Sequence, residues 1–196
     1  MLTNDYVLFA AVFAAAGGIH IWLAIKKKQL TKDRIINMVL RWAFAGYLCF
    51  IAAVTLFPIT LPPCRMPFIT PSVNLDPGML FRYSDAYHMI VNVAGNLLLF
   101  APGVILGRLC GIKVLDSWQS TLAAGVVTSV LIEVMQYCET VWGFTDMPRT
   151  SDINDVALNT AGAVIGWLVF RLFDKRKKIC LGSKGKTQRE KRGALL

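Results

Sequence analysis

The chain has 196 residues, of which 55% are hydrophobic and only 17% are charged, and its mean hydropathy is +0.52. Soluble domains average roughly 45–50% apolar and about 25% charged residues, and here the apolar residues form long uncharged runs, which is typical of a membrane protein. The net charge of +9 does not indicate nucleic-acid binding. Lys and Arg stand in short clusters between apolar runs and form no basic stripe interleaved with aromatic residues. At this length we expect one membrane domain.

Five apolar runs are long enough to cross a bilayer core about 30 Å thick, which needs roughly 20 helical residues. The sequence therefore predicts an all-α fold, a polytopic helix bundle with about five transmembrane helices. In chain order the runs are Tyr6 to Ile25, Val39 to Ile59, Tyr87 to Leu109, Trp118 to Cys138 and Ile153 to Phe173. The first run follows Asp5 where a signal peptide has basic residues, and its lysines come after it, so we expect an uncleaved helix.

The basic residues orient these spans. With the N-terminus outside, eighteen Lys and Arg residues fall on the cytoplasmic side and three, Arg65, Arg82 and Arg149, on the other, which predicts N-out and C-in. Residues 1–37 form the first helix and a basic inner loop, 38–173 the main membrane domain, and 174–196 a basic tail expected to be disordered and attracted to anionic lipid. Cys64 and Cys138 both fall outside, which would permit a disulfide, but isolated small side chains are the favoured interpretation.

Polar side chains recur at helical spacing on the last three spans, near their predicted non-cytoplasmic ends. At 1.5 Å per residue, Glu133 lies about 8 Å and Asn96 about 13 Å from its helix end. An ionisable group at such depth is costly and normally faces the bundle interior or a wet cavity. The three stripes are His88, Asn92 and Asn96; Ser129, Glu133 and Gln136; and Asp152, Asp155 and Asn159.

We interpret these stripes as a functional cleft, with Glu133 and Asp155 as candidate catalytic carboxylates and Arg149 as their counter-charge. The candidate ligand-binding residues are Asn92, Asn96, Gln136, Arg149, Asp152 and Asn159. The structural alternative is that the amides only bond helix to helix. No cofactor and no metal site is predicted; a carboxylate-bound Mg²⁺ is conceivable, but the spacing does not require it.

Small residues and one proline indicate how the helices pack. Gly162 and Gly166 form a GxxxG-like pair on the last span, where backbones can approach closely. Pro102 should kink the third span and free the carbonyl near Leu98. Further glycines at spacings of four or eight on the third span are Gly95, Gly103 and Gly107.

The same positions carry a family resemblance. The segments are Asn92-Val-Ala-Gly-Asn96, Phe100-Ala-Pro-Gly103, Glu133-Val-Met-Gln136 and Arg149-Thr-Ser-Asp152-Ile-Asn-Asp155, followed by Asn159 and Gly162. In order and spacing they resemble the VanZ-like membrane protein family over roughly residues 88 to 170. The resemblance implies a multi-pass protein of the bacterial cell membrane and an association with teicoplanin resistance, but it implies no agreed reaction.

Two functions compete at this cleft. A binding or protective protein would hold a lipid-linked cell-wall precursor or an amphiphilic glycopeptide there, with Arg149 pairing with phosphate or carboxylate. A hydrolase or transferase would act on a lipid-linked substrate, with Glu133 as general base or acid, Asp155 or Asp152 as the paired carboxylate, and Arg149 stabilising negative charge. Transport is less favoured, because the polar cluster keeps to one half of the membrane and no internal repeat is visible. Membrane lipid is the expected partner, and the oligomeric state is left open.

Overall fold

The computed structural model describes residues 3–26, 31–60, 63, 70–82, 85–145 and 149–193. The predicted all-α fold is confirmed: the described residues form five α-helices. Of these, α2, α3, α4 and the part of α5 up to Asp174 are long and apolar enough to cross a membrane. The apolar stretch described in α1, Phe13–Ala24, is shorter, so a membrane crossing by α1 stays a prediction. The helices are α1 Thr3–Lys26, α2 Lys32–Leu56, α3 Ala86–Leu109, α4 Trp118–Trp142 and α5 Ile153–Gly193.

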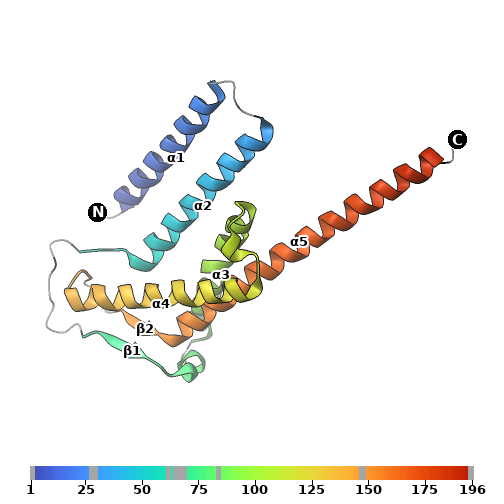
Figure 1. Ribbon diagram of the computed structural model, residues 1–196. Helices are drawn as coiled ribbons and strands as arrows, with labels where there is room; N and C mark the ends of the chain where they lie inside the picture. Colours follow the sequence, from blue (N-terminus) through green and yellow to red (C-terminus); the bar gives the residue numbers. More distant parts are fainter. Residues whose placement is uncertain are drawn as a thin grey trace.

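A short pair of strands, which the sequence analysis did not predict, closes one end of the bundle. Strand β1, Ser72–Asn74, runs parallel to β2, Thr150–Asp152, which leads directly into α5. After β1 the chain makes a 3-10 turn at Pro77–Phe81, which begins where the Asp76 carboxylate accepts a hydrogen bond from the Gly78 amide at 2.8 Å. This end of the bundle, where β1 and β2 lie, is called the strand end below (Figure 1).

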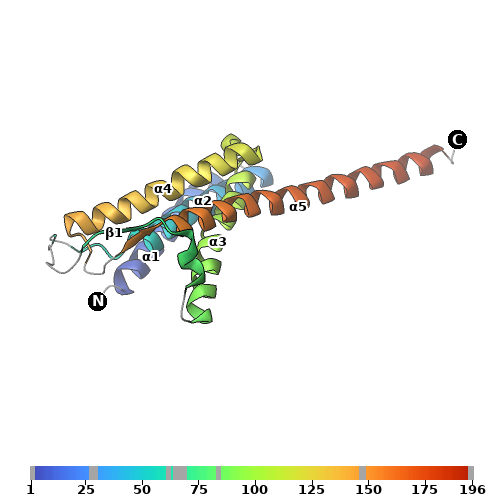
Figure 2. The ribbon, with the colours of Figure 1, turned by 90° about the horizontal axis from the view of Figure 1, so that it is seen from below.

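Helix α5 lies against both α3 and α4, and these three helices form the body of the bundle. Figure 2 shows α4 running alongside α5 while α3 crosses them. The apolar core sits between the three helices and the short turn before α4, where burial of such side chains stabilises the fold. Its buried members are Leu99, Phe100, Val104, Leu115, Ile132, Ala163 and Trp167.

Close backbone contact between α3 and α5 depends on the two predicted glycines. A Cβ atom at Gly162 would overlap the carbonyl of Leu97, and one at Gly166 would overlap the carbonyl of Ala101. The expectation that this GxxxG-like pair lets the helices touch is confirmed. The grouping of Gly95 with the packing glycines was wrong, because a Cβ there would meet no atom within 4 Å.

Pro102 explains one contact between α2 and the body. A proline removes the amide that would bond the carbonyl four residues earlier, here that of Leu98. The Tyr47 hydroxyl on α2 donates to this carbonyl at 3.0 Å and is 3.2 Å from that of Leu99. The predicted free carbonyl is therefore present, and a side chain of a neighbouring helix satisfies it.

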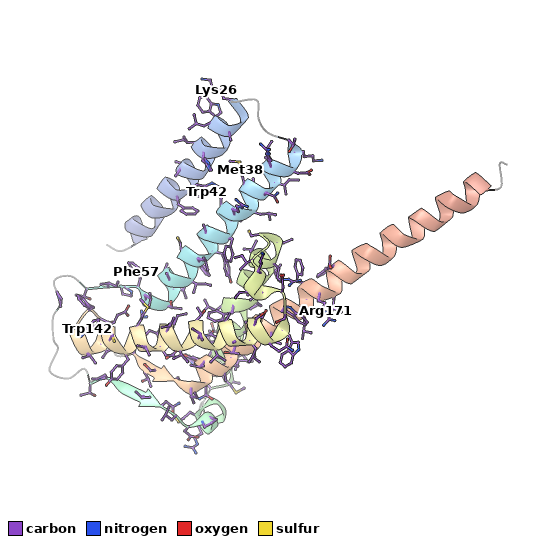
Figure 3. All side chains as sticks on the ribbon, in the orientation of Figure 1. Lys26, Met38, Trp42, Phe57, Trp142 and Arg171 are labelled. Carbon is purple, nitrogen blue, oxygen red and sulfur yellow. The ribbon has the colours of Figure 1, made fainter. Side chains whose placement is uncertain are left out.

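Helix α1 packs against α2 and forms a hairpin with it (Figure 1). Trp42 on α2 points toward α1 in Figure 3, where its indole N–H donates to His20 at 3.2 Å. The ring of Phe13 meets Trp42 edge to face, with centroids 5.0 Å apart. Aromatic contacts of this kind hold the hairpin together.

The basic tail differs from the predicted disorder. Beyond Phe173, α5 continues as helix to Gly193 and extends away from the rest of the molecule (Figures 1 and 2). An existing helix extends without a new nucleation step, and the Lys, Arg, Glu and Gln residues of this segment have good helix propensity. Cys64, one of the two cysteines that the topology would permit to pair, lies outside the described residues.

Candidate functional site

Glu133 is the most deeply buried carboxylate of the predicted site. It lies on α4, is 7% exposed, and its Oε2 accepts a hydrogen bond from the Asp152 amide at 2.9 Å. The Ser151 hydroxyl donates to the Glu133 carbonyl at 2.9 Å. Strand β2 is therefore attached to α4 through this residue. Among the described residues, no donor contacts the second carboxylate oxygen, Oε1.

Asp152 connects the two strands. Its Oδ2 accepts from the Asn74 side chain on β1 at 2.9 Å, and its Oδ1 accepts from the backbone amide and the side chain of Asn154, both at 2.8 Å. Asn154 also donates to the Asp76 carbonyl at 3.1 Å. The Asp152 carboxylate is thus fully engaged in holding the loop that carries β1.

Asp155 faces α3. The Asn96 side-chain amide donates to its Oδ1 at 2.8 Å and to the side-chain Oδ1 of Asn92, one turn away, at 3.4 Å. The carboxylates of Glu133 and Asp152 are close enough to Asp155 to interact electrostatically with it. His88 does not join this group: its Nδ1 pairs with Asp85, 2.8 Å away, at the exposed start of α3.

Asn159 lies one turn deeper than Asp155, on the side of α5 that faces α4. It is 2% exposed and donates to the fully buried Ser129 hydroxyl at 3.0 Å, while its own Oδ1 has no partner among the described residues. Residues from each of the three predicted stripes therefore meet around the first two turns of α5, although His88 and Gln136 do not join them. The group formed by Asn92, Asn96, Glu133, Asp152, Asp155 and Asn159 is called the polar cluster below.

Gln136 and Arg149 lie elsewhere, and the expectation that Arg149 neutralises Glu133 and Asp155 was wrong. The Gln136 amide donates to the Thr55 carbonyl at 2.8 Å, and the Arg149 guanidinium donates to the same carbonyl and to that of Phe57 at 2.7 Å. Arg149 also lies 3.9 Å from Glu139. The last carbonyls of a helix lack internal partners, so both side chains cap the end of α2.

A groove of about 260 Å³ opens beside the polar cluster, between β1, α4 and the start of α5. Its lining is almost entirely apolar, and several of the side chains are well exposed, including Val134 at 51%. Glu133 and Asp152 belong to its wall. The main apolar contributors are Val73, Leu75, Val130, Val134, Tyr137 and Val156.

The strand pairing, which creates this groove, was missed by sequence reasoning. Asn74 and Ser151 take part in it, and both lie outside the apolar runs that guided the prediction. Asn154, which donates to the Asp76 carbonyl, lies at the start of the predicted fifth span, but its position alone did not indicate this partner. One signal was available, because Asp76-Pro77-Gly78 is a strong turn sequence. It would have located the turn, but it could not have paired β1 with a segment 78 residues away.

The site therefore offers acceptors without a matching cation. In the part of the chain that the structure describes, no Lys, Arg or His side chain forms an ion pair with Glu133, Asp152 or Asp155. Within the same part, no group of three or more His, Cys, Asp and Glu side chains is arranged to hold a metal ion. Chemically, the arrangement can accept hydrogen bonds and attract positive charge.

Comparison with known proteins gives one family. The sequence model of the family described as VanZ/LLP1 matches residues 44–174, which is about two thirds of the chain. The match begins within α2 and ends at Asp174, so it contains the strand end, the groove and the whole polar cluster. No curated protein and no solved structure gives a match. With its apolar helices and this coverage, the chain is a membrane protein and belongs to the VanZ-like family.

Proposed function

We propose that this protein binds an amphiphilic molecule of the cell envelope in the groove at the strand end. The charge distribution of the loops favours a multi-pass protein of the bacterial cell membrane with this end on the non-cytoplasmic side. A hydrocarbon chain of the ligand would lie along the groove, and its head group would reach the polar cluster.

The observation that carries the proposal is the groove itself. Exposed apolar side chains are ordinary on a membrane helix, so an apolar face alone would indicate nothing. Here the apolar face is concave, and two carboxylate-bearing residues, Glu133 and Asp152, form part of its wall. Ligand sites usually combine such an apolar concavity with a few fixed polar groups.

Photocrosslinking tests the proposal. The full-length protein in nanodiscs of zwitterionic lipid would be exposed to an alkyl amphiphile with a diazirine in its chain, and adducts would be mapped by mass spectrometry. We expect saturable adducts on residues 130–137 and 150–156. The variant Val134→Trp should lose most of them, because the indole would occupy the groove.

Val127→Trp is the matched control. Val127 lies two turns earlier on α4, is 59% exposed and does not line the groove. We expect this variant to be labelled like the wild type. Adducts that cannot be competed, or equal labelling of both tryptophan variants, would contradict binding in the groove.

Two classes of amphiphile are candidates for the natural ligand. A lipid-linked cell-wall precursor and a teicoplanin-type glycopeptide are both amphiphiles that carry hydrogen-bonding head groups. If the glycopeptide is the ligand, expression of the wild-type chain in a susceptible Gram-positive host should raise the inhibitory concentration of teicoplanin. Val134→Trp should abolish the increase and Val127→Trp should preserve it; an increase that survives Val134→Trp would separate resistance from the groove.

An enzyme acting on a lipid-linked substrate is the second candidate, supported by the electrostatic contact among Glu133, Asp152 and Asp155. Coupled carboxylates are a common arrangement for proton transfer, and Oε1 of Glu133 is available for it. Lipids extracted from the host membrane would be incubated with the protein and analysed by mass spectrometry. A product made by the wild type and absent with Glu133→Gln would favour the enzyme, while unchanged lipids would favour binding alone.

A further inference from the structure

The charges around the groove specify the head group of its occupant. We propose that the groove selects an amphiphile whose head group carries a protonated amine, in preference to one that carries phosphate. This inference rests on the proposed binding function and adds the chemical class of the ligand.

Glu133 is the carboxylate that a head group in the groove would meet. Glu133 is 7% exposed and lines the groove, and the hydrogen bond that its carboxylate accepts from the described residues is made at Oε2, which leaves Oε1 without a donor from them. A carboxylate oxygen that accepts no hydrogen bond from the protein can accept one from a donor on the ligand. A charged donor forms a stronger hydrogen bond than a neutral one.

Two described arginines at the strand end, Arg149 and Arg82, already have acceptors in the protein. Arg149 caps the carbonyls of Thr55 and Phe57 and lies beside Glu139, and its side chain is only 19% exposed. Arg82 pairs with Asp76 at 3.2 Å in the exposed turn after β1. A phosphate entering the groove would therefore meet Glu133 and Asp152 without a compensating cation from these residues, and like charges at close range repel.

The size of the groove limits the size of its occupant. At about 260 Å³ the groove is slightly smaller than the roughly 300–1,000 Å³ of sites that enclose whole drug-sized ligands. It therefore suits part of one hydrocarbon chain together with a compact head group. An alkylammonium fits this description, because an amine is small and brings three donors.

Competition with three soluble amphiphiles of equal chain length would test the selection. An alkylamine, an alkyl alcohol and an alkyl phosphate would each be titrated against the alkyl diazirine probe on wild-type protein in zwitterionic nanodiscs, and the loss of labelling would be measured. We expect the amine to compete about tenfold better than the alcohol, as one charge-assisted hydrogen bond would give, and the phosphate to be the weakest. A phosphate that competes as well as the amine would overturn the proposal, even though the groove itself would still capture chains.

Glu133→Gln provides the second measurement, since it keeps the size of the side chain and removes its charge. We expect the variant to capture the diazirine probe and to lose the preference for the amine. Glu139→Gln is the matched control: Glu139 is also buried on α4, but it faces Arg149 and does not line the groove, so the preference should persist. An unchanged preference for the amine in Glu133→Gln would overturn the proposed selection. If the wild type showed no saturable capture of the probe, the proposed binding function itself would be overturned.

Discussion

The close approach of α3 and α5 leads to a prediction about two glycines on these helices. Gly162→Ala places a methyl group against the carbonyl of Leu97, which is backbone and cannot rotate away. Gly95→Ala makes the same chemical change on α3 where no atom lies within 4 Å. The two substitutions should therefore have opposite effects on stability.

The magnitudes follow from two opposing contributions. Replacing helical glycine by alanine gains about 1 kcal/mol from helix propensity at either position. At Gly162 the forced separation of the helices costs about 3 kcal/mol, the upper part of the range for overpacking, because the obstructing atom is backbone. We expect Gly162→Ala to lower the free energy of unfolding by about 2 kcal/mol and Gly95→Ala to raise it by up to about 1 kcal/mol.

The assay is reversible unfolding of the purified protein in mixed micelles, titrated with SDS and followed by tryptophan fluorescence. Trp167 lies in the buried core beside this contact and should report the separation of the helices. Gly166→Ala, which meets the carbonyl of Ala101, should resemble Gly162→Ala. Equal stabilities for the Gly95 and Gly162 variants would refute the conclusion that these helices touch through Gly162.

Three further predictions concern the attachment of α2 and the topology. Tyr47→Phe should lower the free energy of unfolding by about 1 kcal/mol, because the Leu98 carbonyl loses its donor. The loss should be smaller when Pro102→Ala is also present, since the helix then regains the amide that bonds this carbonyl. An equal loss with and without Pro102→Ala would contradict this account. Arg149→Lys should destabilise the protein more than Gln136→Leu, since lysine cannot cap the Thr55 and Phe57 carbonyls together. SDS titration of both variants measures this order, and a larger loss of stability in Gln136→Leu would contradict the prediction. In a cysteine-free background, Thr70→Cys should react with an impermeant maleimide in whole cells, and Lys113→Cys should react only after permeabilisation. Both positions are exposed, but they lie on opposite sides of the membrane in the N-out arrangement. The opposite labelling pattern would show that the N-terminus is inside.

Local periodicity was sufficient to predict the helices and the residues on their polar faces. Runs of about twenty apolar residues predicted α2 to α5, and spacings of three and four predicted which polar side chains share a face. The carbonyl freed by Pro102 and the close contact at Gly162 also follow from local chemistry, since a missing amide and a missing Cβ act on their immediate surroundings.

The sequence could not specify the partners of those residues, because partners are set by how the helices cross. Arg149 illustrates this: charge alone favoured Glu133 and Asp155, yet the position of α2 brings the carbonyls of Thr55 and Phe57 within reach. The groove is a tertiary feature as well, because pairing of β1 with β2 joins segments that no local pattern relates. Helical spacing thus determined which polar residues share a helix face. The tertiary structure decided which of them are exposed, as His88 is, which hold the bundle and which line the groove, since that division depends on contacts between segments distant in the chain.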